Sequence, residues 1–173
     1  MKNLSLVFAL AMVLTQSAFA DSVALGKVEF LVDTNVKMFK FKGQAGELQS
    51  KLVHTGPQLT HLELSIPVQS LKTGMDMRDR HMRERIFTTP DGKTPDVVFT
   101  ADSVQCAAQC EVTGNLTIRG QTRPQKLLLT MKDPTHVEGT AQVLLSTFGI
   151  EAPSQAGVKV ADAVAVNFAV ELK

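Results

Sequence analysis

The feature that most constrains the fold of this chain is a two-residue alternation of apolar and polar side chains. In Leu62–Val68, the clearest run of the first half, every second residue is apolar. The chain ends on another such run, Val164–Leu172, where Val and Phe alternate with Ala, Asn and Glu. Successive side chains of a β-strand point to opposite faces, so this period predicts strands with one buried face each.

Roughly eight or nine short runs of this kind follow one another along the chain. Most are joined by turns too short for a parallel crossover; Arg119–Thr122, for example, is typical of a tight hairpin turn. The pattern therefore predicts an antiparallel all-β domain, either a sandwich or a closed barrel, and closure would remove the exposed strand edges.

One segment, Leu71–Phe87, interrupts the alternation, and we expect it to be helical. Thr73 followed by Asp76 has the form of a capping box at a helix start. Three apolar residues fall on one face of such a helix: Met75, Met82 and Ile86. The other faces are strongly basic, with Arg78, Arg80, Arg83 and Arg85. A helix of this kind can cover the open end of a barrel or simply pack one stripe on a sheet.

Residues 1–20 are typical of a secretory signal peptide, because Lys2 precedes an apolar run and Ala18-Phe19-Ala20 offers a small-x-small cleavage site. Cleavage after Ala20 would leave one exported domain, residues 21–173. The sequence contains 18 Lys and Arg against 17 Asp and Glu. This near-neutral balance argues against a nucleic-acid partner, since such binding needs a basic footprint.

Cys106 and Cys110 are the two cysteines of the sequence and lie in Cys-Ala-Ala-Gln-Cys between two strand-like runs. In an oxidising compartment we expect them to form a disulfide across a hairpin, although a thiol pair that binds Cu(I) is an alternative. The histidines lie in unrelated segments without ligand spacing, so we expect no metal site; they are His54, His61, His81 and His136. No common catalytic motif occurs, and we expect no enzymatic activity.

The expected interior is apolar, since the sequence has no Trp and no Tyr to supply an indole or phenol donor. The inward-facing side chains of the expected strands, with two from the helical segment, are Phe30, Phe41, Leu64, Ile66, Met82, Phe87, Leu116, Ile118, Leu129, Val166 and Phe168. The pattern alone leaves open whether these side chains line a cavity or fill a solid core.

Several stretches together resemble the YceI-like family of polyisoprenoid-binding proteins. They occur in the family's order and cover nearly all of the mature chain; they are Ile66–Val68, Ser70–Gly74, Arg78–Met82, Ile86–Phe87, Gly114–Pro124, Phe148–Ile150 and Gly157–Val160. The resemblance implies a lipocalin-like antiparallel β-barrel of about eight strands with one short helix inserted mid-chain. It also implies a periplasmic protein that holds a long isoprenoid or similar lipid in an elongated apolar tunnel.

We therefore expect a carrier for a polyprenyl chain or quinone tail, with no cofactor besides this lipid, acting as a monomer or homodimer. The inward-facing set above would bind the lipid. The helical segment would gate the tunnel, with Arg78, Arg83 and Arg85 available to an anionic headgroup or, transiently, to a membrane surface. The alternative is a non-enzymatic adaptor, or a metal- or thiol-binding protein that acts through the helix and the Cys106/Cys110 hairpin.

Overall fold

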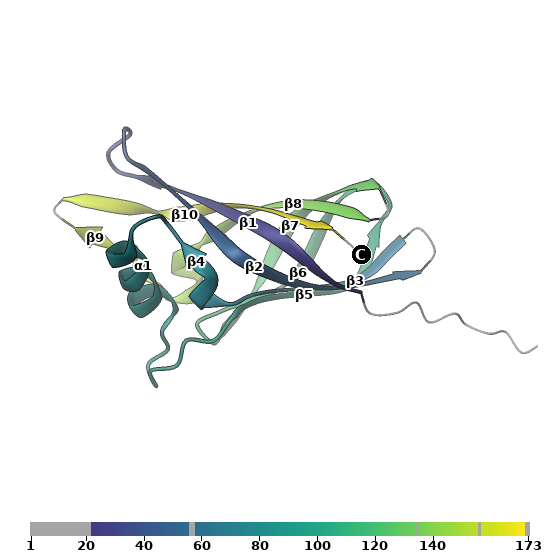
Figure 1. Cartoon of the computed structure of the whole chain (residues 1–173), viewed down its shortest axis with the longest axis horizontal. Helices are drawn as coiled ribbons and strands as arrows, with labels where there is room; N and C mark the ends of the chain where they lie inside the picture. Colours follow the sequence, from purple (N-terminus) through teal and green to yellow (C-terminus); the bar gives the residue numbers. More distant parts are fainter. Residues whose placement is uncertain (1–21, 56–57, 134, 156, 172–173) are drawn as a thin grey trace, which may run out of the picture.

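The computed structural model describes residues 22–55, 58–133, 135–155 and 157–171 (Figure 1). The expected signal peptide lies outside these residues. The strands are β1 Ser22–Thr34, β2 Lys40–Thr55, β3 Gln58–Ile66, β4 Leu71–Lys72, β5 Val97–Cys106, β6 Gln109–Ile118, β7 Gln121–Asp133, β8 His136–Leu144, β9 Ser154–Gln155 and β10 Val158–Glu171. The helical segments are η1 Val68–Ser70, α1 Asp76–Met82, η2 Arg83–Phe87 and η3 Leu145–Phe148.

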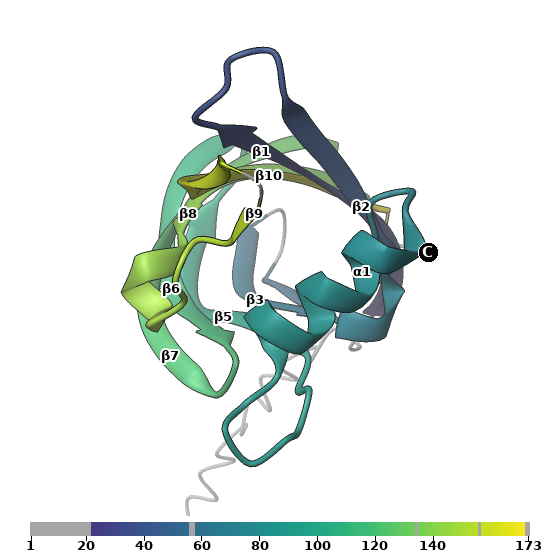
Figure 2. The ribbon, with the colours of Figure 1, turned by 90° about the vertical axis from the view of Figure 1, so that its left-hand side faces the viewer.

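Eight long antiparallel strands form a closed barrel in the order β1-β10-β8-β7-β6-β5-β3-β2. The barrel closes because β2 pairs back onto β1, from Ser22 opposite Leu52 to Asp33 opposite Lys40. Figure 2 looks into the barrel from one end and shows the ring of strands with α1 across the opening. The predicted antiparallel all-β fold is confirmed, and of the two architectures the closed barrel is correct, with its long edges paired.

Arg119 and Gly120 form the tight turn that the sequence predicts between β6 and β7. Both residues have positive φ angles, 52° and 73°, as the central residues of a two-residue type I′ hairpin do. This turn sets the β6–β7 register, in which Ile118 lies opposite Gln121 and Leu116 opposite Arg123.

The mid-chain helix is shorter than the sequence predicts. Leu71 and Lys72 form β4, which pairs with β2, and α1 begins only at Asp76 and continues into the π-helical turn η2. The expected capping box is wrong, because Met75 occupies the N-cap position without a side-chain cap. Gly74, at a φ of 81°, turns the chain here, and Thr73 bonds instead to Asp79, well inside the helix.

The half of the barrel remote from α1, the packed half, holds most of the deeply buried side chains of the described core. Seven of its side chains are almost completely shielded from solvent: Leu52, Leu59, Leu62, Cys106, Leu129, Val137 and Val170. The expected disulfide between Cys106 and Cys110 lies in the β5–β6 hairpin at this end, with the two Cα atoms 5.6 Å apart. Because both sulfurs are joined, the Cu(I)-binding alternative lacks free thiols in this structure.

Candidate ligand-binding cavity

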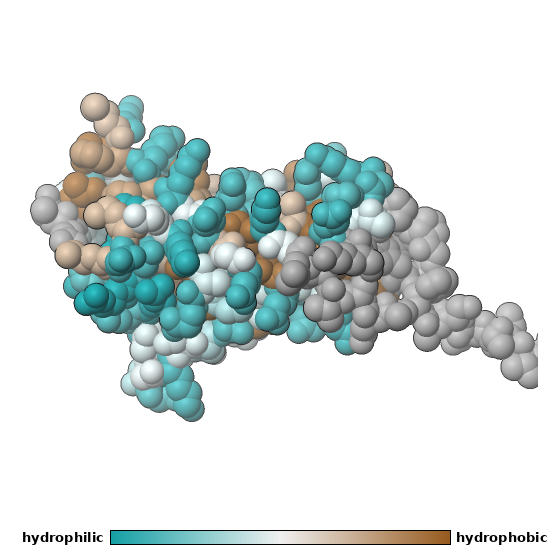
Figure 3. Space-filling view, in the orientation of Figure 1, coloured by the Kyte–Doolittle hydropathy of each residue, from teal (hydrophilic) through white to brown (hydrophobic). Residues whose placement is uncertain are grey.

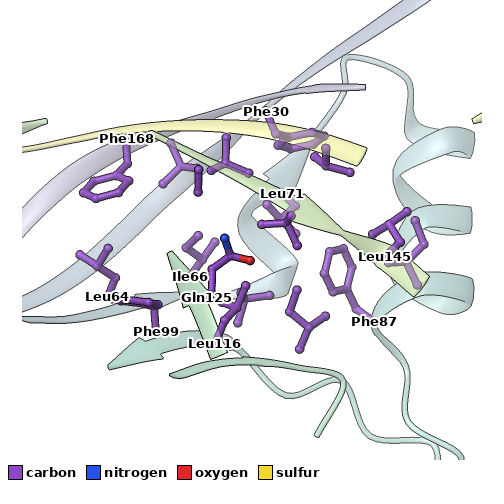
Figure 4. A pocket seen from close by; sticks show the side chains of 18 of the residues that line it. Phe30, Leu64, Ile66, Leu71, Phe87, Phe99, Leu116, Gln125, Leu145 and Phe168 are labelled. Carbon is purple, nitrogen blue, oxygen red and sulfur yellow. The ribbon is translucent and has the colours of Figure 1, made fainter. Parts of the chain in front are cut away.

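The half of the barrel nearer α1 encloses a cavity of about 190 Å³. Every long strand contributes to its wall, and α1 and η2 add Met82, Ile86 and Phe87 from the end (Figure 4). The two-residue alternation explains this wall, since each strand turns its apolar residues inward.

The structure places nine of the eleven side chains selected from the sequence in this wall: Phe30, Leu64, Ile66, Met82, Phe87, Leu116, Ile118, Val166 and Phe168. Phe41 lies further out, at the mouth described below. Leu129 is inward-facing and fully buried but does not border the cavity. It lies opposite Cys110 in the packed half, so its face of the strand was predicted correctly and its position along the barrel was not.

Three phenylalanines of the wall cover glycines on neighbouring strands, and Phe99 of β5 does so at Gly114 of β6. The other two lie directly opposite their glycines. Phe30 of β1 lies opposite Gly43 of β2, and Phe168 of β10 lies opposite Gly139 of β8. A Cβ atom at either glycine would fall well inside contact distance of the ring. The rings therefore rest against the sheet because these positions carry no side chain.

Gln125 of β7 is the one polar side chain in the cavity wall among the described residues. Its Nε2 donates to the backbone carbonyls of Lys126 and Gln142, at 2.9 and 3.1 Å. Because both carbonyl oxygens can only accept hydrogen bonds, the amide nitrogen of Gln125 must face them. The amide oxygen Oε1 then has no partner among these groups and is available to a ligand in the cavity (Figure 4). The sequence analysis missed Gln125, although it stands in phase with Leu127 and Leu129.

An outer hollow of about 490 Å³ adjoins the cavity and forms its mouth. Five residues border both spaces: Phe30, Val32, Met82, Ile86 and Val160. The mouth is edged by α1, by the β1–β2 hairpin and by the segment around β9, and its polar lining includes His81, Arg78 and Arg85. The apolar cavity thus opens under α1, the end that the sequence predicts.

A hydrogen-bonded cluster fixes the start of α1 at the mouth. Asp79, only 6% exposed, accepts hydrogen bonds at 2.7 Å from the Thr73 N–H and 2.5 Å from the Thr73 hydroxyl. Arg78 donates to the Thr73 hydroxyl and carbonyl oxygens, at 2.7 and 2.6 Å. Its guanidinium also lies 4.8 Å from the centre of the Phe41 ring, in cation–π contact.

The three arginines expected to face a headgroup therefore differ in their surroundings. Arg78 is half-buried in the cluster with Thr73, and Arg83 is half-buried with a 3.4 Å hydrogen bond to the carbonyl of Leu71. Arg85 borders the mouth, is exposed, and makes no hydrogen bond or ion pair with the described residues. Arg85 is the cation most available to a ligand.

No three His, Cys, Asp or Glu side chains come together as metal ligands within the described ranges. Two histidines are engaged with carboxylates instead: His61 lies 2.7 Å from Asp102, and His136 lies 3.0 Å from Asp133. None of the helices in the described part of the chain is long and apolar enough to cross a membrane.

The fold and the cavity define a closed eight-stranded antiparallel barrel with an apolar cavity that opens beneath a short helix. The family model of the YceI-like domain matches residues 21–172. The chain therefore belongs to the YceI-like family, as its sequence resemblance indicates. The UPF0312 protein of Pseudomonas paraeruginosa is 32% identical over 105 residues, 55% of this chain and 54% of that protein. The chain thus matches about half the length of such curated relatives.

Solved structures share the fold at low sequence identity. BcnA of Burkholderia cenocepacia superposes with a TM-score of 0.69 at 20% identity, covering 86% of this chain and 96% of that one. A domain from Saccharophagus degradans, described as polyisoprenoid-binding, gives 0.65 at 16% identity, covering 89% and 100%. The YceI protein of Campylobacter jejuni gives 0.59 at 18% identity, with both chains fully covered. These structural similarities show that the chain shares the barrel fold of these proteins.

Proposed function

We propose that the protein is a periplasmic carrier that holds the apolar chain of an isoprenoid-type lipid, a polyprenyl chain or quinone tail, in its barrel. The observation that carries this proposal is the cavity wall, which is apolar throughout its described lining except for Gln125. A polyprenyl chain has no hydrogen-bonding groups, so its affinity derives from buried apolar area, about 0.8 kcal/mol per CH₂-sized unit.

The geometry favours a ligand that enters with its apolar end first. The inner cavity ends at the packed half of the barrel and opens toward α1, so the end of the lipid chain lies innermost and its following part fills the mouth. A headgroup then lies near Arg85 and His81. Met82 and Phe87 lie in the cavity wall from the α1 end, and we assign them the role of a gate, to which the flexibility of Met is suited.

The polyisoprenoid-binding description of the Saccharophagus domain, which has the same fold, supports this ligand class. Export to the periplasm is supported by the disulfide, since such bonds persist in oxidising compartments. In this role the protein binds and releases its lipid without chemical conversion, as a monomer or homodimer, and meets a membrane surface transiently to load and unload.

The test is to purify the protein from its native periplasm, extract it with organic solvent and identify bound molecules by mass spectrometry. The proposal expects a long-chain isoprenoid lipid at close to one molecule per protein chain. A variant with the cavity blocked, Val166→Trp, purified in parallel, should carry much less. Protein that emerges lipid-free from the native periplasm and takes up no polyprenyl chain in vitro would contradict the carrier function.

A further inference from the structure

Exposed apolar side chains gather at the mouth of the barrel. Among the described residues, seven large apolar side chains are exposed, and five of them lie on the β1–β2 hairpin tip or at the start of α1: Val36, Met38, Phe39, Met75 and Met77. Met38 is 92% exposed and Met77 64%. Figure 3 shows the apolar hairpin tip projecting from the hydrophilic surface around it. The other two, Leu128 and Leu144, lie on strands of the barrel wall.

The hairpin tip is held in a defined shape. The Thr34 hydroxyl lies 2.9 and 2.8 Å from the carbonyl oxygens of Val36 and Phe39, and it accepts the Val36 N–H at 3.2 Å. Asn35 joins the tip to the start of β10, because its Nδ2 donates to the Gly157 carbonyl and its Oδ1 accepts the Lys159 N–H. The backbone that carries the exposed Met38 side chain is therefore held in one shape. Several of its N–H and C=O groups are hydrogen-bonded within the tip.

Cations surround these apolar side chains. Residues 33–42 contain three lysines against Asp33, and residues 72–85 contain five lysines and arginines against three acidic residues. One of those acids, Asp79, is buried. The third edge of the mouth, residues 151–162, carries Lys159 against two acidic residues. The whole sequence has a formal charge of only +1, so positive charge is concentrated on the hairpin and helix that carry the exposed apolar groups.

We propose that these residues form a membrane-docking face: Val36, Met38 and Phe39 of the hairpin tip, with Met75 and Met77 of α1. Its partner is the surface of an anionic phospholipid bilayer. The apolar side chains insert at the boundary between headgroups and acyl chains. The exposed cations of the same two segments, Lys37, Lys42, Arg80 and Arg85, lie among the anionic headgroups. A self-associating surface or a protein partner would have less use for the excess of cations on the two segments that carry the apolar groups.

The docking face accounts for how the proposed carrier takes up its lipid from a membrane and releases it there. Phe39, Met75 and Met77 border the mouth as well, so docking places the opening of the cavity directly on the bilayer. A lipid chain then passes between membrane and cavity without crossing water, where each CH₂ unit would be unfavourable. The inference rests on the proposed function for its purpose, but vesicle binding is measured on lipid-stripped protein and does not depend on any cargo.

The absence of Trp and Tyr from the sequence makes a single introduced Trp an unambiguous reporter. We expect Met38→Trp protein, mixed with vesicles containing phosphatidylglycerol, to show a blue-shifted emission that brominated phospholipids quench. Leu128→Trp, at an exposed apolar position of the barrel wall, is the matched control and should show neither change. Emission of Met38→Trp that stays unshifted and unquenched with anionic vesicles overturns the proposal.

Binding itself is measured by vesicle co-sedimentation. Met38→Ser with Phe39→Ser should weaken binding to anionic vesicles by about tenfold or more, because two exposed apolar side chains are lost. Leu128→Ser with Leu144→Ser should change it by less than about twofold, since those side chains lie outside the docking face. Added salt should weaken binding of the unaltered protein. If the hairpin variant binds vesicles normally, or loses only self-association in ultracentrifugation, the face is not a bilayer-docking site.

Discussion

Replacing Val166 with Trp tests directly whether the cavity is the binding site. Val166 lies near the middle of β10, opposite Phe30 on β1 and Ala141 on β8, with its side chain in the cavity wall. The substitution adds about seven non-hydrogen atoms, each occupying roughly half the ~30 Å³ of a liquid water molecule, for a total on the order of 100 Å³. The cavity holds about 190 Å³, so the added ring atoms take up roughly half of it.

The effect on affinity follows from the lipid atoms that the indole displaces. Displacing about four CH₂-sized units at about 0.8 kcal/mol each removes about 3 kcal/mol of binding free energy, between two and three orders of magnitude in Kd. The cost to folding should be small, near the lower end of the ~1–3 kcal/mol of overpacking, because the added ring enters existing space.

The assay compares lipid per protein chain, from extraction and mass spectrometry, with the free energy of unfolding for each variant. Leu129→Trp is the control for a packed site and should show the full overpacking cost, because Leu129 is 0% exposed and away from the cavity. Leu128→Trp, on the outer face, should change neither quantity. Two results would refute the reasoning: Val166→Trp that retains lipid at unchanged stability, or Val166→Trp that unfolds as readily as Leu129→Trp.

Three further predictions concern the gate, the disulfide and acid stability. Met82→Ala with Phe87→Ala should lower the amount of retained lipid strongly and the melting temperature only slightly, since both side chains border the cavity at its α1 end. A variant that melts early yet retains lipid normally would show that these side chains stabilise the fold and do not gate the cavity. Denatured, unreduced protein should yield no free thiol, and replacing both cysteines by Ala should cost about 2 kcal/mol of unfolding free energy; two reactive thiols per chain would contradict this. The Ser146 hydroxyl and N–H bind the Asp162 carboxylate and hold the pKa of Asp162 below its ordinary 3.8. The stabilisation from Asp162 is therefore present above about pH 4 and lost as the pH falls through the lowered pKa, so Asp162→Asn should flatten the acid limb of a melting-temperature profile; an unchanged limb would exclude this contribution.

The residues facing the interior could be predicted from the sequence because alternation is a local property of each strand. Leu116 and Leu129 illustrate the limit of such reasoning. Both were correctly predicted to face inward, yet Leu116 borders the cavity and Leu129 lies in the packed half. Which part of a barrel is filled depends on side chains contributed by strands far apart in the sequence, and a period of two carries no information on that.

The errors around the helix and at Gln125 have local causes. Thr73 and Asp76 match a capping box by spacing, but the turn at Gly74 brings Thr73 against Asp79 instead. Gln125 lies within the mostly polar first half of β7, which runs to Lys126, so its sequence neighbours give no reason to place it in the interior. Only the structure shows that its amide nitrogen is held by two backbone carbonyls while the side chain borders the cavity.

The Phe–Gly pairs in the barrel wall determine how wide the cavity is. The rings of Phe30 and Phe168 occupy space that is free only because Gly43 and Gly139 carry no Cβ atom. The width of the cavity therefore depends on these two glycines as much as on the aromatic side chains. A single Gly139→Ala change would tilt the Phe168 ring toward the axis and narrow the passage, while the strand pairing and the loops stayed as they are. The width of the cavity can thus be changed by a single methyl group, and at Gly139 this change lies away from the mouth, since Phe168 borders the inner cavity alone.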